Sequence, residues 1–127
     1  PSDSGRIHST VRQKWDAGDV EVREGMREFG RITDDALAAI HASDAAALGR
    51  AMDANFATRR RLFGDPTLGE ANLMMVGIAQ RHGVPVKFPG SGGAVIGLCV
   101  GAAAMRAMRD ELERNGAVFC NLAPNGP

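Results

Sequence analysis

Several residue types are scarce in this sequence, and their scarcity argues against some kinds of covalent link and binding site. It has no tyrosine, one tryptophan and two cysteines among 127 residues. Cys99 and Cys120 both lie in apolar stretches, so buried free thiols are expected rather than a disulfide or a thiolate metal site. His8, His41 and His82 are scattered along the chain without metal-ligand spacing. We therefore expect no metal site in this sequence.

Net charge and long apolar runs are lacking as well. Fifteen basic and fifteen acidic residues cancel, which argues against a broad electrostatic attraction to nucleic acid or to an anionic membrane. No apolar run reaches the roughly 18 residues that a membrane-spanning helix needs, and no signal peptide is visible. A reducing intracellular compartment, the cytoplasm, is therefore the expected location.

What is present is the composition of one folded domain covering residues 1–127. Hydrophobic residues make up 44% of the chain, which favours folding around a single core. The basic residues are thirteen arginines and two lysines. Arginine is preferred where a planar carboxylate or phosphate is bound bidentately, although a codon bias of the genome accounts for the excess equally well. The composition therefore permits an anion-binding site without requiring one.

The hydrophobic pattern changes from helical to strand-like along the chain. The predicted helices are residues 7–15, 19–42, 44–63, 67–83 and 102–115. The predicted strands are residues 84–88, 94–100 and 117–122. Asp19 is a suitable N-cap for the second helix, and Thr67 with Glu70 has the pattern of a capping box for the fourth. Helices followed by strand, turn, strand, helix and strand indicate an α+β fold.

The most informative stretch is the glycine-rich turn formed by Gly90, Ser91, Gly92 and Gly93, between two predicted strands. Three glycines in four residues allow backbone angles closed to other residues and let a ligand approach the main chain. Successive N–H groups in such a turn form a concavity that suits phosphate or carboxylate. A hairpin turn whose glycines only permit the bend explains the same pattern. Both interpretations stay open on the residues alone.

A second candidate site lies on the predicted helix 44–63. The apolar stripe of this helix consists of Leu48, Met52, Phe56, Leu62 and Phe63. Arg59 falls in the middle of the stripe, and Asn55 points the same way one turn earlier. Arginine keeps its charge and is costly to bury unpaired, so its guanidinium requires a carboxylate or a phosphate. Three interpretations stay open. An acidic side chain of the same chain pairs with Arg59, or the Arg59 side chain reaches out to solvent. In the third, Asn55 and Arg59 bind an anionic group of a ligand.

Three separated segments together resemble the C-terminal half of a GHMP-family small-molecule kinase. The segments are SDSGRIHS at 2–9 followed by residues 11–12, residues 55–56 with RRRLFGD at 59–65, and KFPGSGGA at 87–94. Within that family the likeness is greatest to glucuronokinases, sugar-1-kinases that phosphorylate glucuronic acid with ATP. The resemblance covers essentially all 127 residues in the same order.

The resemblance implies a ferredoxin-like α+β domain, with helices packed on a small antiparallel sheet. Such a domain packs on an N-terminal domain, with ATP and the sugar between them, and the turn at 90–93 lies near the transferring phosphate. This chain has Ala94 where many members continue with glycine. The family's ATP-cradling Pro-x-x-x-Gly-Leu-Ser-Ser-Ser motif and its catalytic Asp are absent from the sequence. ATP and Mg²⁺ are therefore expected in the complete enzyme, and neither is expected on residues 1–127 alone.

Two classes of function remain open at this point. The first is the substrate-side part of an ATP-dependent sugar-1-kinase acting on the anomeric hydroxyl of glucuronic acid or a related sugar. The second is a non-catalytic α+β ligand-binding or assembly module that retains the anion-binding loop. A homoserine-, mevalonate- or galactokinase-like relative differs from the first only in substrate. Separation from an N-terminal domain would leave an apolar patch, a known driver of association, so a homodimer is a further expectation.

Overall fold

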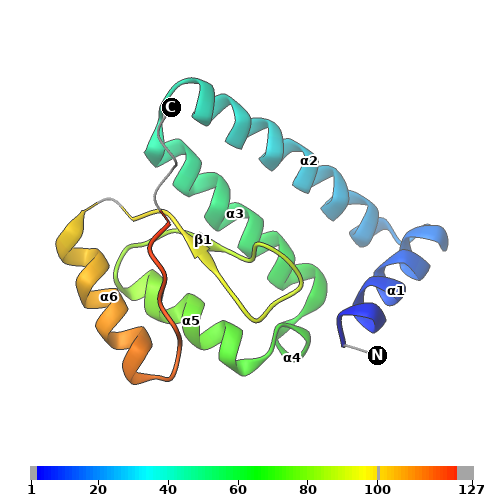
Figure 1. Cartoon of the computed structure of the whole chain (residues 1–127). Helices are drawn as coiled ribbons and strands as arrows, with labels where there is room; N and C mark the ends of the chain where they lie inside the picture. The colour runs from blue at the N-terminus through cyan, green and yellow to red at the C-terminus, as the bar shows by residue number, and fades with distance from the viewer. Residues whose placement is uncertain (1–2, 100, 123–127) are drawn as a thin grey trace.

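The computed structural model describes residues 3–99 and 101–122, with side chains from Thr10 onward. Its elements are α1 (Asp3–Asp16), α2 (Val20–His41), α3 (Ala45–Phe63), α4 (Asp65–Leu68), α5 (Glu70–Arg81), β1 (Val86–Lys87), β2 (Ile96–Gly97) and α6 (Ala102–Arg114). Figure 1 shows this order along the chain, with helices before and after one short pair of strands. The predicted α+β class, with helices packed on a small antiparallel sheet, is confirmed.

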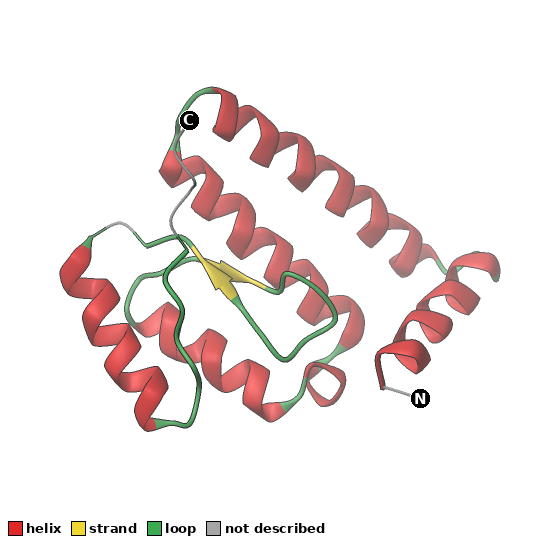
Figure 2. Cartoon of the chain, viewed as in Figure 1, coloured by secondary structure: helices red, strands yellow, loops and turns green. Residues whose placement is uncertain are grey.

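The two strands lie at the centre of the helices (Figure 2). They pair antiparallel, with Val86 opposite Gly97 and Lys87 opposite Ile96. β1 contacts both α3 and α5, while α2 packs along α3 and α6 packs on α5. α1 contacts the start of α2 (Figure 1). None of the helices in the described part of the chain is long and apolar enough to cross a membrane.

The core lies where α3, α5, β1 and α6 meet. Its buried members are Phe56, Leu68, Val76, Ile78, Ala79, Val84, Val86, Phe88, Met108 and Leu112. Phe88, Ile78 and Val76 are the largest side chains that are completely buried. The Phe56 and Phe88 rings meet edge to face, with centroids 5.8 Å apart, an arrangement that aromatic pairs favour. The chain therefore enters the glycine turn directly after one of its most deeply buried side chains.

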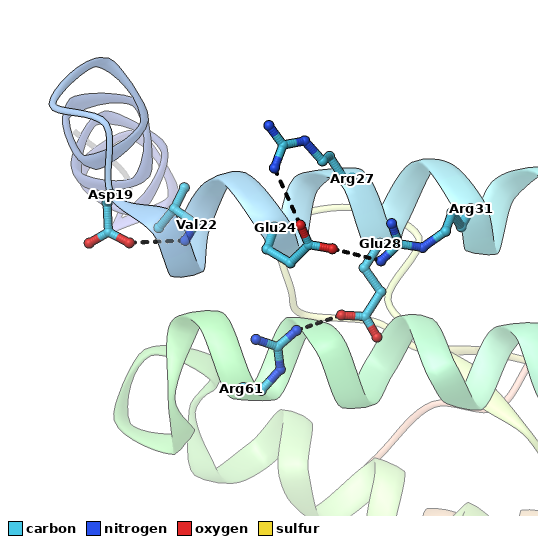
Figure 3. Close-up of polar contacts among 7 residues, drawn as sticks. All are labelled: Asp19, Val22, Glu24, Arg27, Glu28, Arg31 and Arg61. Atoms are coloured by element: carbon cyan, nitrogen blue, oxygen red, sulfur yellow. Dashed lines mark hydrogen bonds and ion pairs between the residues drawn. The ribbon is translucent and has the colours of Figure 1, made fainter.

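Aspartate caps fix the beginnings of the two longest helices. The Asp19 carboxylate accepts a hydrogen bond from the Val22 N–H at 3.0 Å, as the sequence predicts (Figure 3). Asp44 does the same for α3, accepting from the Ala47 N–H at 2.9 Å. Each cap satisfies one of the amides that a helix start leaves without a partner. The boundaries predicted for these two helices therefore agree closely with the structure.

The predicted capping box and the predicted closing strand are wrong. Gly69 has a φ of +84° and separates α4 from α5, so Thr67 lies within α4 and Glu70 begins α5 after a glycine cap without a side-chain hydrogen bond. Residues 117–122 are irregular, and Val118 and Leu122 are exposed. A strand needs a neighbouring strand to pair with. Among the described residues the sheet consists of β1 and β2 alone, and neither pairs with this segment. The helix predicted from residue 7 also begins earlier, at residue 3.

Ion pairs join α2 to α3 along their exposed side. Arg61 on α3 donates to the Glu28 carboxylate on α2, with 2.6 Å between Nη2 and Oε2 (Figure 3). Within α2, Glu24 accepts from both Arg27 and Arg31. These pairs are exposed to solvent, so each contributes little to stability. Arg61, two positions after Arg59, is thereby engaged in a structural contact.

Glu111 joins α6 to the end of α5. Its carboxylate accepts from Arg81 and lies 2.6 Å from His82 Nε2. Arg81 first, and His82 second, lower the pKa of Glu111. The two hydrogen-bonded partners therefore favour the ionised form of this carboxyl in the folded state.

Replacing Glu111 by Gln is expected to reduce the loss of stability in acid. Because the pKa of Glu111 is lowered on folding, its contribution is fully present above the unfolded-state value of about 4.3 and disappears as the pH falls through the lower folded value. Urea unfolding at about pH 7, 4 and 3 measures this. The unmodified chain should lose more unfolding free energy across the series than E111Q; equal losses would contradict the assignment.

Candidate functional site

β1 carries the chain from the core into an exposed glycine turn. Phe88 is 2% exposed, whereas residues 90–93 are all exposed. Gly92 and Gly93 have φ values of +140° and +82°, a region that glycine enters without the steric cost of a side chain. The bend predicted from the glycines is therefore present in the backbone. In Figure 1 the loop between β1 and β2 lies beside the end of α3 and the start of α5.

One amide of the turn is bound by a side chain that the sequence analysis missed. The Gly93 N–H donates to Asn72 Oδ1 at 2.9 Å, and Asn72 Nδ2 donates to the Leu68 carbonyl oxygen at 2.7 Å. The amides of Gly90, Ser91 and Gly92 donate to no other residue that the structure describes. The contact joins residues 21 positions apart, so periodicity could not reveal it. The position of Asn72 in the first turn of α5, beside the apolar run that follows it, was the signal that the sequence offered.

Arg59 lies beside the residue that leads into the turn. Its guanidinium carbon is 5.0 Å from the centroid of the Phe88 ring and 5.6 Å from that of Phe63. Both distances are within the range of a cation–π attraction. The helical-wheel prediction that Arg59 sits among the apolar side chains of α3 agrees with these contacts. The guanidinium on α3 therefore lies against Phe88, two positions before the glycine turn begins.

The Arg59 guanidinium has no acidic partner within the described residues. Its Nε is buried and makes no hydrogen bond. The two arginines that follow it are paired, Arg60 with Asp65 at 2.6 Å and Arg61 with Glu28. Within the described residues, therefore, no carboxylate of the chain itself neutralises Arg59. A desolvated donor without a partner is energetically costly.

Burial lowers the pKa of Arg59 from the usual arginine value. The guanidinium nevertheless stays protonated at neutral pH, because arginine does not lose its proton under physiological conditions. The side chain is thus a fixed cation held against two aromatic faces. A carboxylate or phosphate would provide charge-assisted hydrogen bonds for its N–H groups.

Asn55 lies one turn before Arg59 on α3 and is half-buried. Its side chain makes no hydrogen bond to another residue that the structure describes, which leaves its amide available to a ligand. The N-terminal segment that carries part of the family resemblance, residues 2–9, has its side chains outside the described residues. A role for Asn55, Arg59 and the turn 90–93 in binding a ligand stays a prediction.

An open groove of the described surface lies away from these residues. This groove of about 520 Å³ runs between α2 and α3 and is lined mainly by alanines together with Asp35, Asp44 and Arg50. None of the predicted site residues lines it. Within residues 3–99 and 101–122, no group of three metal-ligating side chains gathers that could hold a metal ion. The turn and Arg59 are therefore candidates because of their hydrogen-bonding groups and charge, and not because they line this groove.

This α+β domain presents main-chain amides in an exposed glycine turn and, among the described residues, an arginine whose buried Nε has no partner beside Phe88, so it is a candidate anion-binding domain. Comparison with curated proteins then gives two relatives. The chain is 41% identical over 117 residues to glucuronokinase 1 of Arabidopsis thaliana, and 38% identical over 119 residues to the probable glucuronokinase 2 of the same plant. The matches cover 91% and 93% of this chain but 32% of each relative, so the chain spans about a third of their length.

These two matches confirm the resemblance to glucuronokinases inferred from the three sequence segments. The matched stretches cover 91% and 93% of the chain and so span the turn and the helix that carries Arg59. No protein-family model matches the chain. No solved structure matches it either.

Proposed function

We propose that this chain is the C-terminal, substrate-side domain of an ATP-dependent GHMP-type sugar kinase that phosphorylates the anomeric hydroxyl of glucuronic acid or a related sugar. The observation that carries the proposal is the Arg59 guanidinium, which lies beside Phe88 at the entry to the glycine turn and whose buried Nε has no hydrogen-bond partner among the described residues. The likeness to two glucuronokinases supports the same substrate class. A uronic acid carries a carboxylate where a neutral hexose carries a hydroxymethyl group.

Arg59 and Asn55 are assigned to the sugar. The guanidinium of Arg59 binds the uronate carboxylate, and the Asn55 amide donates to a carboxylate or hydroxyl oxygen of the same ligand. An arginine–carboxylate pair is strong because both hydrogen bonds are charge-assisted and can form side by side. The Phe63 and Phe88 rings hold the guanidinium plane before the sugar arrives, which reduces the ordering cost of binding.

The turn is assigned to the phosphate side of the reaction. The free amides of Gly90, Ser91 and Gly92 are neutral donors that fit phosphate oxygens, and no side chain or backbone atom would lie within 4 Å of a Cβ placed at Gly90. The described residues offer no cluster of carboxylates for a cation, so we assign Mg²⁺ to ATP and the other domain. ATP supplies the phosphoryl group, and the turn stabilises the negative charge that develops beside it.

A kinase assay on the complete protein tests the proposal. We expect ATP-dependent formation of a sugar 1-phosphate, with kcat/KM highest for glucuronate among glucuronate, galacturonate, glucose and galactose. Residues 1–127 alone should give no turnover. A preference for neutral sugars would contradict the uronate assignment. Absence of turnover with every sugar would favour the non-catalytic module.

A further inference from the structure

Asn72 uses both ends of its side-chain amide to connect the glycine turn with the helices beneath it. Its Oδ1 accepts from the Gly93 N–H at 2.9 Å, and its Nδ2 donates to the Leu68 carbonyl oxygen at 2.7 Å. The first partner can only donate and the second can only accept, so the orientation of the amide is fixed. The side chain is therefore fully occupied by two parts of the backbone far apart in sequence.

The carbonyl group that accepts from Asn72 belongs to a buried residue. Leu68 is 5% exposed and belongs to the core cluster. Leu68 is the last residue of α4, and Gly69 is the N-cap of α5. Asn72 therefore lies in the first turn of α5. A hydrogen bond to the Leu68 carbonyl therefore ties the Asn72 amide to packed structure rather than to a mobile surface segment.

The turn lies directly against this amide. A Cβ placed at Gly92 would lie 3.0 Å from Asn72 Nδ2, and the φ of Gly92 is +140°. Any other residue at position 92 would be strained in its backbone and crowded by Asn72. The close approach and the Gly93 hydrogen bond together hold the second half of the turn, while the amides of Gly90, Ser91 and Gly92 donate to none of the described residues.

We propose that Asn72 is a positioning residue that holds the glycine turn in its ligand-binding shape before an anion arrives. It occupies the Gly93 amide and leaves the preceding three amides for phosphate oxygens. Glycine-rich backbone is costly to order, and a turn ordered in advance binds its ligand without that cost. The assignment of phosphate as the ligand rests on the proposed function, whereas the hydrogen bonds of Asn72 do not.

This role separates Asn72 from Arg59 in kinetic terms. The turn faces the phosphoryl group, whose charge is stabilised most in the transition state, so loss of its shape lowers kcat. The sugar is held by Arg59 and Asn55, so the KM for glucuronate stays nearly unchanged. We expect Asn72→Ala to lower kcat of the complete protein about tenfold. A substitution at Arg59 is expected to act mainly on that KM.

Three variants distinguish the parts of the contact. Asn72→Ala removes both hydrogen bonds. Asn72→Asp keeps an acceptor for the Gly93 N–H but loses the donor to Leu68 and adds negative charge beside the turn. Asn115→Ala is the matched control, because Asn115 donates to the Glu111 carbonyl oxygen at the end of α6, away from the turn. All three are first compared with the unmodified chain by circular dichroism and thermal unfolding.

The experiment has a ligand-free arm, an anion arm and a kinetic arm. Amide hydrogen exchange on the 127-residue chain should be about tenfold faster at Gly93 in N72A, and unchanged in N115A and N72D. Titration with inorganic triphosphate, followed by NMR at the amides of residues 90–92, should give about tenfold weaker binding for N72A. N72D should also bind triphosphate weakly, through repulsion rather than through loss of turn shape.

Unchanged Gly93 exchange in N72A would overturn the proposal, whatever the enzyme does. Faster exchange with unaltered triphosphate binding and unaltered kcat would overturn it too, because the contact would then be structural only. If the complete protein lacks kinase activity, the proposed function fails, yet the exchange and triphosphate arms still decide the role of Asn72. If N72A does not fold, the exchange of N72D decides: Gly93 protection equal to that of the unmodified chain supports the role, and loss of protection overturns it.

Discussion

Arg59→Met in the complete protein is expected to raise the KM for glucuronate about 10- to 100-fold, with a much smaller effect on the KM for ATP. A hydrogen bond to a charged group is worth about 1.5–3 kcal/mol, and each 1.4 kcal/mol changes an affinity about tenfold. Steady-state kinetics with each substrate varied in turn measures both constants. Equal increases in the two values, or no increase in either, would show that Arg59 does not bind the uronate carboxylate.

Methionine is chosen because it separates binding from packing. Its side chain fills the space between Phe63 and Phe88 with apolar atoms and removes the buried Nε that lacks a partner. Loss of the cation–π contacts costs about 0.5–1 kcal/mol each, and removal of an unsatisfied buried donor returns about 1–3 kcal/mol. The unfolding free energy of R59M should therefore stay within about 1 kcal/mol of the original or rise. A large destabilisation with an unchanged KM would mark Arg59 as a structural residue.

Arg61→Met provides the matched control. Arg61 follows Arg59 by two positions on α3 but is paired with Glu28 on α2, away from the turn. Because that pair is exposed, its loss should change stability by no more than about 1 kcal/mol. The KM for glucuronate should stay unchanged in R61M. An increase there as large as in R59M would point to a general effect of removing positive charge from α3.

The long helices were predictable because their signals are local. α2 and α3 each have a periodic apolar face and an aspartate that caps the first turn, so residues near one another in sequence determine both ends. The division at Gly69 was not predictable, because the pattern from Thr67 to Glu70 is compatible with one helix and only the backbone angle of the glycine ends it. The closing strand failed because its pairing depends on distant residues.

The same distinction applies to the candidate site. The position of Arg59 in the apolar stripe of α3 follows from 100° per residue, and Phe63 lies one turn further along the same stripe. Its contact with Phe88 depends on how β1 crosses α3, which no local pattern specifies. The hydrogen bond between Asn72 and Gly93 is non-local for the same reason. The sequence thus indicated where Arg59 and the glycine turn lie on their elements but not the non-local contacts that each makes, and their role in binding a ligand stays a prediction.

Phe88→Ala is expected to destabilise the domain by about 3–5 kcal/mol, the range for truncating a buried phenylalanine. Phe88 is 2% exposed, and its ring packs against Phe56 and beneath the Arg59 guanidinium. The loss is a large part of the roughly 5–15 kcal/mol by which domains are stable. Urea unfolding measures it, with Phe119→Ala as the matched control. Phe119 packs at the edge of the same core and is only partly buried, so F119A should cost clearly less; equal costs would contradict the central place of Phe88.

Phe88→Leu tests whether the ring also serves the site. Leucine retains most of the apolar volume, so the domain should fold, but it offers no aromatic face to the guanidinium. We expect the KM for glucuronate to rise in F88L, and the combination with R59M to raise it no further, because residues that act through one contact are not additive. Independent, additive increases would mean that Phe88 affects the sugar site by another route. In that case the Phe88 ring would stabilise the core without helping to position the Arg59 guanidinium.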